Sequence, residues 1–300
     1  MEPIRSLLFV PGNRQKMLDK ARDVPADVLV PDLEDSVPPE EKAAARKVVA
    51  ANLAGFAIRG QHLFVRINAL STGLGEEDLD AVLGPQIEGI SVGKADSATD
   101  LVELDRLLGR MERRKGLPAG SIAVIPWIES ALGIISAHDI ARASPRIVAI
   151  SFGADDFTAD MGIPRTKEGT EQFYPRAAVA IAARAAGVMA FDTPFVDFRD
   201  EEGLARDCAS VRQLGYTGKW CIHPGQVATV NRLFTPSEEE VAYCRRVAAA
   251  FDEAVARGTA ATSVDGRMID VPGYQRAQRI LDLAAAIARR ERGGAAGGRA

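Results

Sequence analysis

Short apolar runs and longer helical patterns alternate along this chain, and that rhythm limits the possible folds more than any other feature. The apolar runs that read as strands lie at 6–11, 27–33, 62–68, 88–94, 122–128, 146–152, 187–193 and 218–223. They are apolar almost throughout, which is typical of strands buried on both faces. Strands that alternate with helices pair in parallel through crossover helices.

Amphipathic patterns between and after these runs predict helices at 14–22, 39–54, 76–83, 97–115, 130–140, 172–186, 200–214, 225–233 and 237–257. Eight strand–helix units over about 220 residues predict an α/β fold, the TIM (β/α)8 barrel, which typically has ~250 residues. A doubly wound open sheet is the competing fold. It usually has fewer strands, and no G-x-G-x-x-G follows the first strand here.

The chain continues beyond the eighth unit. The segment TSVDGRMIDVPG predicts a turn at Asp265 and Gly266 between two short strands, and an amphipathic helix follows at 274–290. We therefore divide the chain into a barrel at 1–257, a C-terminal extension at 258–291 and a Gly/Ala-rich tail at 292–300. The composition of the tail predicts disorder.

Charge and cysteine usage exclude several classes of protein. The net charge is −4 with acids and bases mixed, so no basic patch indicates nucleic acid. No apolar run approaches the ~20 residues of a membrane span, and the first residues lack the features of a signal peptide. The three cysteines form no C-x-x-C pair, which favours a reducing compartment. We expect a cytoplasmic protein that binds neither nucleic acid nor membrane.

Polar residues recur where the predicted strands end. In a TIM barrel all these ends lie on one rim, where active sites are built. The alternative is that strand ends are polar because they reach solvent, but charges inside apolar runs such as FVRIN are costly to bury without partners. The rim residues are Asp32, Glu34, Asp35, Arg66, Asn68, Lys94, Glu129, Asp155, Asp156, Asp192 and His223.

Two of these carboxylates, Glu129 and Asp156, follow consecutive strands. Hard cations take oxygen ligands, commonly one or two carboxylates with water and substrate, so the pair indicates Mg²⁺ or Mn²⁺. Each residue has an alternative role: Glu129 as the cap of the helix at 130–140, and Asp156 as the cap of a short turn. Glu34 and Asp35 would reach the metal through bound waters, and Asp35 or Ser36 would also suit the start of the next helix.

Basic residues on the rim suit anionic groups. The Arg66 guanidinium fits a bidentate contact with a substrate carboxylate, and its alternative is an ion pair with Glu34 or Asp35. Arg14 and Lys20 follow the first strand, on a helix opened by VPGN, which favours a phosphate. The alternative for both is a solvated helix surface.

Taken together, seven stretches resemble the citrate lyase beta subunit-like family, which includes the malyl-CoA, citramalyl-CoA and citryl-CoA lyases. In order, they are RSLLFVPGNR, DLEDSV, VRIN, IESALG, FGADDFTADMG, KWCIHPGQV and DGRMIDVP, and the resemblance covers essentially residues 4 to 290. One departure is VGKADS where the family more often has P-K. It keeps Lys94 and alters the following loop.

The resemblance implies a TIM barrel that assembles as trimers or hexamers and holds magnesium through Glu129 and Asp156. By position, it also implies that Arg66 binds the substrate acid and that Asp270 of the M-I-D motif is the catalytic acid/base. Asp270 would be carried on the extension to the rim of a neighbouring subunit. The residues expected to contact the CoA ester are Phe9, Arg14, Lys20, His223 and Pro224.

The implied reaction is reversible cleavage of a 3-hydroxyacyl-CoA that bears a terminal carboxylate. A retro-Claisen step would give a 2-oxo acid and acetyl-CoA, with Asp270 protonating the thioester enolate. Two alternatives stay open. One is a citrate lyase subunit that acts on an acyl-carrier protein, and the other is a CoA-independent 2-oxo acid aldolase. Glyoxylate and pyruvate products differ by one methyl group, worth only ~1–3 kcal/mol of discrimination.

Overall fold

The computed structural model describes residues 3–56 and 60–297, with side chains as far as residue 292. These residues form two compact units: Ile4–Asn231, and a second unit from Arg232 onward that includes Pro3. The boundary falls earlier than the predicted one at residue 257, so the helix predicted at 237–257 groups with the extension. No helix among the described residues is both long enough and apolar enough to cross a membrane.

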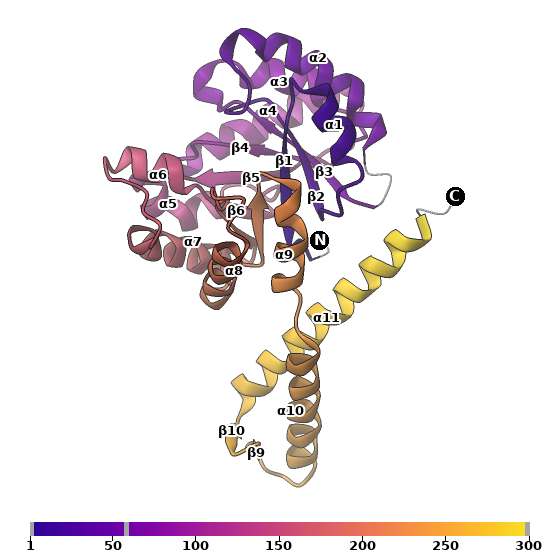
Figure 1. Cartoon of the computed structure of the whole chain (residues 1–300), viewed down its shortest axis with the longest axis vertical. Coiled ribbons are helices and arrows are strands. Elements are labelled where there is room, and N and C mark those ends of the chain that lie inside the picture. Colours follow the sequence, from indigo (N-terminus) through magenta and orange to yellow (C-terminus); the bar gives the residue numbers. More distant parts are fainter. Residues whose placement is uncertain (1–2, 57–59, 298–300) are drawn as a thin grey trace. The chain divides into compact units, whose positions relative to one another are not determined.

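The first unit is a closed parallel barrel whose strands follow one another in chain order (Figure 1). This confirms the predicted TIM barrel. The observed strand ends differ from the predicted ones by at most three residues, the largest difference being the sixth strand, which begins at Ala149. The strands are β1 (Ser6–Pro11), β2 (Val28–Asp32), β3 (His62–Ile67), β4 (Gly89–Val92), β5 (Ala123–Ile128), β6 (Ala149–Phe152), β7 (Met189–Asp192) and β8 (Gly218–Cys221).

Helices connect consecutive strands around the outside of this barrel, and one more follows the eighth strand (Figure 1). The sequence predicts each of them except the seven-residue α6. They are α1 (Gln15–Ala21), α2 (Lys42–Asn52), α3 (Gly75–Val82), α4 (Ala98–Lys115), α5 (Ala131–Ala141), α6 (Ala154–Asp160), α7 (Phe173–Ala186), α8 (Glu201–Leu214) and α9 (Pro224–Phe234), with short 3₁₀ turns η1 (Pro39–Glu41), η2 (Leu53–Gly55), η3 (Leu70–Thr72) and η4 (Thr170–Gln172).

Side chains at alternate strand positions fill the barrel interior. Successive side chains of a strand point to opposite faces, so residues two apart share the inner face. Leu7, Val28, Phe64, Trp127 and Trp220 are buried in this inner cluster, and the partly buried Phe9 packs against it. The interior is therefore a packed core, and the polar side chains at the carboxyl ends of the strands lie above it.

Capping residues fix two of the turns on the rim. Ser97 caps α4 in a reciprocal capping box with Asp100. Ser130 caps α5, and its hydroxyl accepts a hydrogen bond from the Gly133 N–H at 2.9 Å. Because Ser130 is the cap, Glu129 does not cap this helix. Its carboxylate is available to the rim.

The second unit consists of two helices and a hairpin. Here α10 (Glu238–Ala256) packs against α11 (Val271–Gly297), and β9 (Thr262–Val264) pairs antiparallel with β10 (Arg267–Ile269). Asp265 and Gly266 form the predicted turn with positive φ values of 50° and 74°. The helix α11 runs to Gly297, so it covers most of the segment assigned to a disordered tail, and residues 298–300 of that tail lie outside the described residues.

Candidate active site

Arg66 and Asp32 form a buried, bidentate ion pair on the rim. They are register partners at the ends of β3 and β2. Arg66 Nε donates to Asp32 Oδ1 at 2.7 Å, and Nη2 donates to Oδ2 at 2.6 Å. Burial acts to raise the pKa of Asp32, but the charge and hydrogen bonds of Arg66 outweigh it and hold the pKa below its usual value. Asp32 thus fixes the plane of the guanidinium.

The remaining nitrogen of Arg66 faces two further carboxylates. Its Nη1 donates to Asp35 Oδ2 at 3.1 Å and lies 3.3 Å from Glu34 Oε2. The ion pairs that the sequence leaves open as an alternative are therefore present. The Asp35 side chain is 57% exposed, whereas Glu34 is buried. The contact with Asp35 is the one that an incoming anion can replace at least cost, because both partners there reach water.

An aromatic column lies beneath this guanidinium. The Arg66 carbon Cζ is 4.3 Å from the centroid of the Phe9 ring, a cation–π contact. Phe9 stacks on Trp220 at 4.4 Å, and Trp220 lies 4.7 Å from Trp127. The two indole N–H groups donate to buried serine hydroxyls, so the rings are fixed. Phe9 and Arg66, both predicted site residues, are thus brought together.

Glu34 and Glu129 converge on Gly93, which follows β4. A Cβ atom at Gly93 would lie 2.8 Å from Glu34 Oε1 and 3.0 Å from Glu129 Oε1, so the missing side chain leaves the space between the two carboxylates. Lys94 adopts a left-handed backbone conformation, φ 56°, and its N–H donates to Glu129 Oε1 at 2.6 Å. Sequence alone does not show that Gly93 makes room for two carboxylates, because this depends on how the ends of β2, β4 and β5 lie beside one another.

The carboxylates of this cluster carry more negative charge than Arg66 balances. Burial raises the pKa of Glu129 to about 8, with the charges of Asp156 and Glu34 adding to it. Burial also raises the pKa of Glu34 to about 7, against the opposing charge of Arg66. The pKa of the half-buried Asp156 is raised by burial and then by the charge of Asp35. Buried carboxylates without cationic partners are costly to ionise, and a bound cation would remove that cost.

The donor set fits a hard cation. Only carboxylate oxygens are present, and these suit Mg²⁺ or Mn²⁺ better than softer metals. Among the described residues, no three histidine, cysteine or carboxylate side chains converge as a complete cage. Two carboxylates completed by waters and substrate oxygens are a common ligand set for Mg²⁺. Asp156 lies in the first turn of α6 rather than capping a turn, and it lines the same cavity as Glu129.

A cavity of about 750 Å³ opens beside these carboxylates. It lies at the carboxyl ends of β4 and β5 and extends to the first turns of α4 and α5. Glu129, Asp156 and Gly93 form one wall. The cavity is large enough for a small organic acid with its waters.

Four predicted site residues lie away from the carboxylate cluster. Arg14 and Lys20 are exposed, the first directly before α1 and the second within it. His223 and Pro224 are exposed at the start of α9, and the His223 ring stacks on Phe198 at 4.9 Å. Since β8 pairs with β1, all four belong to the same sector of the rim.

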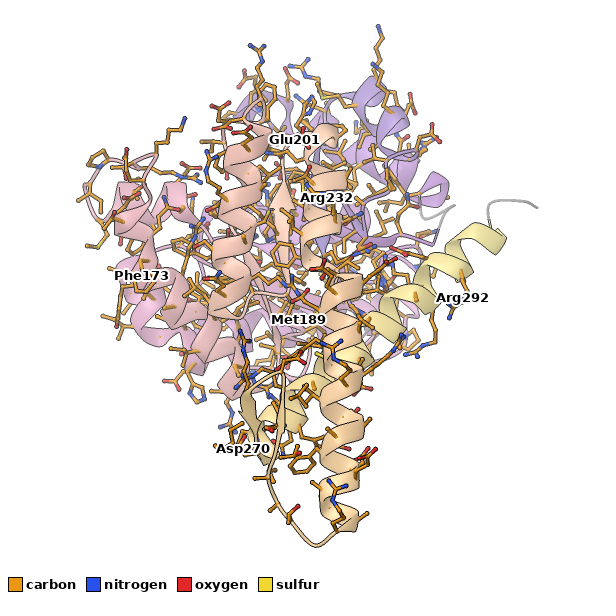
Figure 2. The ribbon with its side chains drawn as sticks, turned by 60° about the horizontal axis from the view of Figure 1, so that its bottom comes forward. Phe173, Met189, Glu201, Arg232, Asp270 and Arg292 are labelled. Atoms are coloured by element: carbon orange, nitrogen blue, oxygen red, sulfur yellow. The ribbon has the colours of Figure 1, made fainter. Side chains whose placement is uncertain are left out.

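Asp270 belongs to the second unit. It precedes α11, as Figure 2 shows, and its Oδ1 accepts a hydrogen bond from the Gly273 N–H at 3.0 Å. This contact is that of a helix cap.

Comparisons with known proteins give one consistent result. Residues 5–224 match the family model described as HpcH/HpaI aldolase/citrate lyase. The chain is 39% identical over 280 residues to the citrate lyase subunit beta of Leuconostoc mesenteroides subsp. cremoris, covering 93% of each chain. It is 39% identical over 306 residues to an L-malyl-CoA/beta-methylmalyl-CoA lyase of Cereibacter sphaeroides, covering 95% of this chain and 96% of the relative.

Solved structures resemble the whole chain as well. The protein CitE from Mycobacterium tuberculosis, in complex with magnesium, acetoacetate and coenzyme A, superposes with a TM-score of 0.77 at 31% identity, covering 94% of this chain and 98% of that one. A citrate lyase from Burkholderia xenovorans LB400 gives a TM-score of 0.84 over 100% of this chain and 97% of that one. At 22% identity, the latter likeness concerns the fold alone.

Proposed function

Because this chain belongs to the HpcH/HpaI aldolase/citrate lyase family and is a lyase, we propose that it cleaves a carbon–carbon bond in a 3-hydroxyacyl-CoA thioester that bears a terminal carboxylate. The products would be acetyl-CoA, or a homologue, and a 2-oxo acid. The relative from Cereibacter is named for such thioesters, and the CitE structure contains magnesium and coenzyme A.

The observation that carries the proposal is the pair of buried glutamates that meet at Gly93 beside Arg66. Glu129 and Asp156 would hold Mg²⁺, or Mn²⁺, directly, and Glu34 and Asp35 would hold its waters. When bound, the cation supplies positive charge that stabilises negative charge developing on the substrate oxygens.

The protein side chains would orient the substrate. Its carboxylate would replace Asp35 at the Nη1 of Arg66, while Asp32 keeps the guanidinium in plane. Phe9 would pack against the thioester. The phosphates of CoA would follow the sector of the rim that carries Arg14, Lys20, His223 and Pro224.

As the adjacent carbon–carbon bond breaks, the proton of the substrate hydroxyl would pass through a water to a rim carboxylate, Glu34 or Asp35. The electron pair of that bond passes to the thioester as an enolate, and the hydroxyl carbon becomes the carbonyl of the 2-oxo acid. Asp270 would donate a proton to the enolate carbon and give acetyl-CoA. We propose that Asp270 comes from a neighbouring subunit of a homotrimer or hexamer, and that the enzyme works in the cytoplasm.

One other function has an observation in its favour. The curated relatives from Leuconostoc and Escherichia coli are named as subunits of citrate lyase, at 39% and 38% identity. In that case the chain would be a subunit of citrate lyase that acts on a citryl group carried by an acyl-carrier protein. A CoA-independent 2-oxo acid aldolase is the remaining alternative within the family.

Product analysis would distinguish these functions. Malyl-CoA, citramalyl-CoA and citryl-CoA would each be incubated with the full chain and Mg²⁺, with EDTA as the control. Release of acetyl-CoA with the matching 2-oxo acid, abolished by EDTA, is the expected result. No turnover of any thioester would contradict the proposal, and assays with a citryl acyl-carrier protein and with free oxo acids would then test the two alternatives.

A further inference from the structure

The cavity beside Glu129 is lined by two chemically different kinds of side chain. The larger apolar ones come from η3, α4 and α5 and are Leu70, Leu101, Leu104 and Leu132. The lining also contains carboxylates beyond the proposed metal ligands: Asp96, Asp100, Glu103 and Asp160. Lys94 is the one basic residue among the described cavity-lining residues.

Hydrogen bonds hold three of these carboxylates in place. Asp96 accepts a hydrogen bond from the Ser130 hydroxyl. Asp160 accepts one from the Ala131 N–H at 2.8 Å, and Asp100 belongs to the capping box of α4. Since these contacts are with a hydroxyl and backbone amides, they do not themselves neutralise the negative charge of these side chains.

We infer, on the basis of the proposed function, that the oxo-acid part of the substrate carries a single carboxylate and that its other substituent is hydrogen or a small apolar group. Arg66 would take the one carboxylate. The substrate carbon that bears the hydroxyl would lie at Glu129 and Asp156. A further substituent on this carbon would extend into the cavity that these residues line. There an apolar group would contact the leucine side chains. A second carboxylate would instead lie close to the aspartate and glutamate side chains of the cavity, and this repulsion between like charges is unfavourable.

The three candidate thioesters are therefore expected to differ in kcat/KM. Malyl-CoA and citramalyl-CoA yield glyoxylate and pyruvate, each with one carboxylate. Citryl-CoA yields oxaloacetate, which has two. The wild-type enzyme is therefore expected to prefer malyl-CoA or citramalyl-CoA over citryl-CoA by roughly tenfold or more in kcat/KM.

Leu132 offers a matched pair of variants. Its side chain is 57% exposed in the first turn of α5 and lines the cavity, so a substitution there leaves the core intact. Leu132→Lys places an ammonium group at the cavity, and Leu132→Met keeps the size without a charge. We expect Leu132→Lys to shift the selectivity toward citryl-CoA by about tenfold, and Leu132→Met to leave it within about twofold.

The experiment has two readouts so that the inference and the proposed function can fail separately. The first is kcat/KM for the three thioesters with wild type and both variants. The second is the calorimetric Kd of pyruvate and of oxaloacetate in the presence of Mg²⁺. A wild type that turns over citryl-CoA as well as the others would overturn the inference and leave the lyase function standing, as would an unchanged selectivity in Leu132→Lys.

Absence of turnover on all three thioesters would contradict the proposed function alone, because the two Kd values still decide the inference. Tighter binding of pyruvate than of oxaloacetate, reduced or reversed in Leu132→Lys, supports it. Equal binding, tighter binding of oxaloacetate, or no binding of either acid would overturn it.

Discussion

The carboxylate of Asp32 accepts two hydrogen bonds from the guanidinium of Arg66, one from Nε and one from Nη2, and it is fully buried beneath the rim. The proposed substrate-binding group is thus held by a second charged group that contacts no substrate. Two backbone N–H groups, of Glu34 and Ser36, also donate to Asp32. One carboxylate therefore positions both Arg66 and the turn that carries Glu34.

Asp32→Asn is expected to lower kcat/KM by about 100-fold, mainly through the KM for the substrate acid, because Arg66 loses its fixed plane. The variant also weakens the hydrogen bonds of the buried Nε and Nη2 of Arg66, whose Nη1 keeps Asp35 and Glu34, at a cost of about 1–3 kcal/mol in the free energy of unfolding. Steady-state kinetics below the melting transition, with circular dichroism of the same samples, separates the two effects. Asp80→Asn is the control. Its ion pair with Arg114 is exposed and neither residue belongs to the site, so the KM should change by less than about twofold.

Glu129→Gln should separate activity from stability. The amide keeps the shape of the side chain but removes a carboxylate whose burial is unfavourable. We expect the Mg²⁺ dependence of turnover to disappear, with a loss of more than about 100-fold in kcat. We also expect the metal-free variant to melt higher than the wild type at pH 8.5. A metal-free Glu129→Gln variant that melts lower there would contradict the buried-charge argument.

The metal-free protein should lose stability as pH rises. Its folded state raises the pKa of Glu34 to about 7 and that of Glu129 to about 8, from the ordinary glutamate value of 4.5. Between pH 4.5 and about 8 these two groups bind more protons in the folded state than in the unfolded state, so their contribution to stability is largest below pH 4.5 and is lost as pH rises through 7 and 8. Thermal melts in EDTA from pH 5.5 to 9, compared with those of Glu129→Gln, measure this contribution.

Binding of Mg²⁺ should release protons at pH 7, because the two glutamates ionise when the cation binds. Calorimetric titration of Mg²⁺ in buffers with different ionisation enthalpies counts these protons. Absence of proton release, together with melts that do not depend on pH, would show that both carboxylates are already ionised in the metal-free protein.

The sequence predicts the barrel well because each strand is a continuous apolar run and each crossover helix has a clear period. It does not predict α6, whose seven residues Ala154–Asp160 include three aspartates and too few apolar positions to show a period. It also misses the length of α11, since the Gly/Ala composition of 292–300 predicts disorder and the described helix continues to Gly297.

The site is predicted less completely, for a physical reason. The sequence identifies the rim residues Glu34, Arg66, Glu129 and Asp156. Which of these side chains contact one another depends on the register of the strands and on the direction of each side chain. Asp32 is the partner that holds Arg66 in plane, because the two are in register at the ends of β2 and β3. That register could have been found by aligning the ends of the two predicted strands. The approach of Glu129 to Gly153, which decides how much space the site has, requires coordinates.

Asp270 can be tested by complementation between inactive variants. Asp270→Asn should abolish turnover but leave α11 capped, because asparagine caps helices as well as aspartate does. Glu129→Gln is inactive for a different reason. If each Asp270 serves a neighbouring barrel, mixed oligomers of the two variants should recover about a quarter of the wild-type activity, since one site in four combines two intact residues. Mixed oligomers without recovered activity would show that Asp270 does not act between subunits.

Gly153→Ala should disturb the site through Glu129. A Cβ atom at Gly153 would lie 2.5 Å from Glu129 Oε2, 2.7 Å from Glu129 Cβ and 3.3 Å from the Trp127 ring, so the glutamate must shift. We expect about tenfold or greater loss of Mg²⁺ affinity and of kcat, with an overpacking cost of about 1–3 kcal/mol. Gly109→Ala in α4 is the control, because its nearest neighbour is 3.8 Å away and alanine favours the helix. Wild-type Mg²⁺ affinity in Gly153→Ala would show that the position of Glu129 is not critical, and Mg²⁺ titration of both variants decides this.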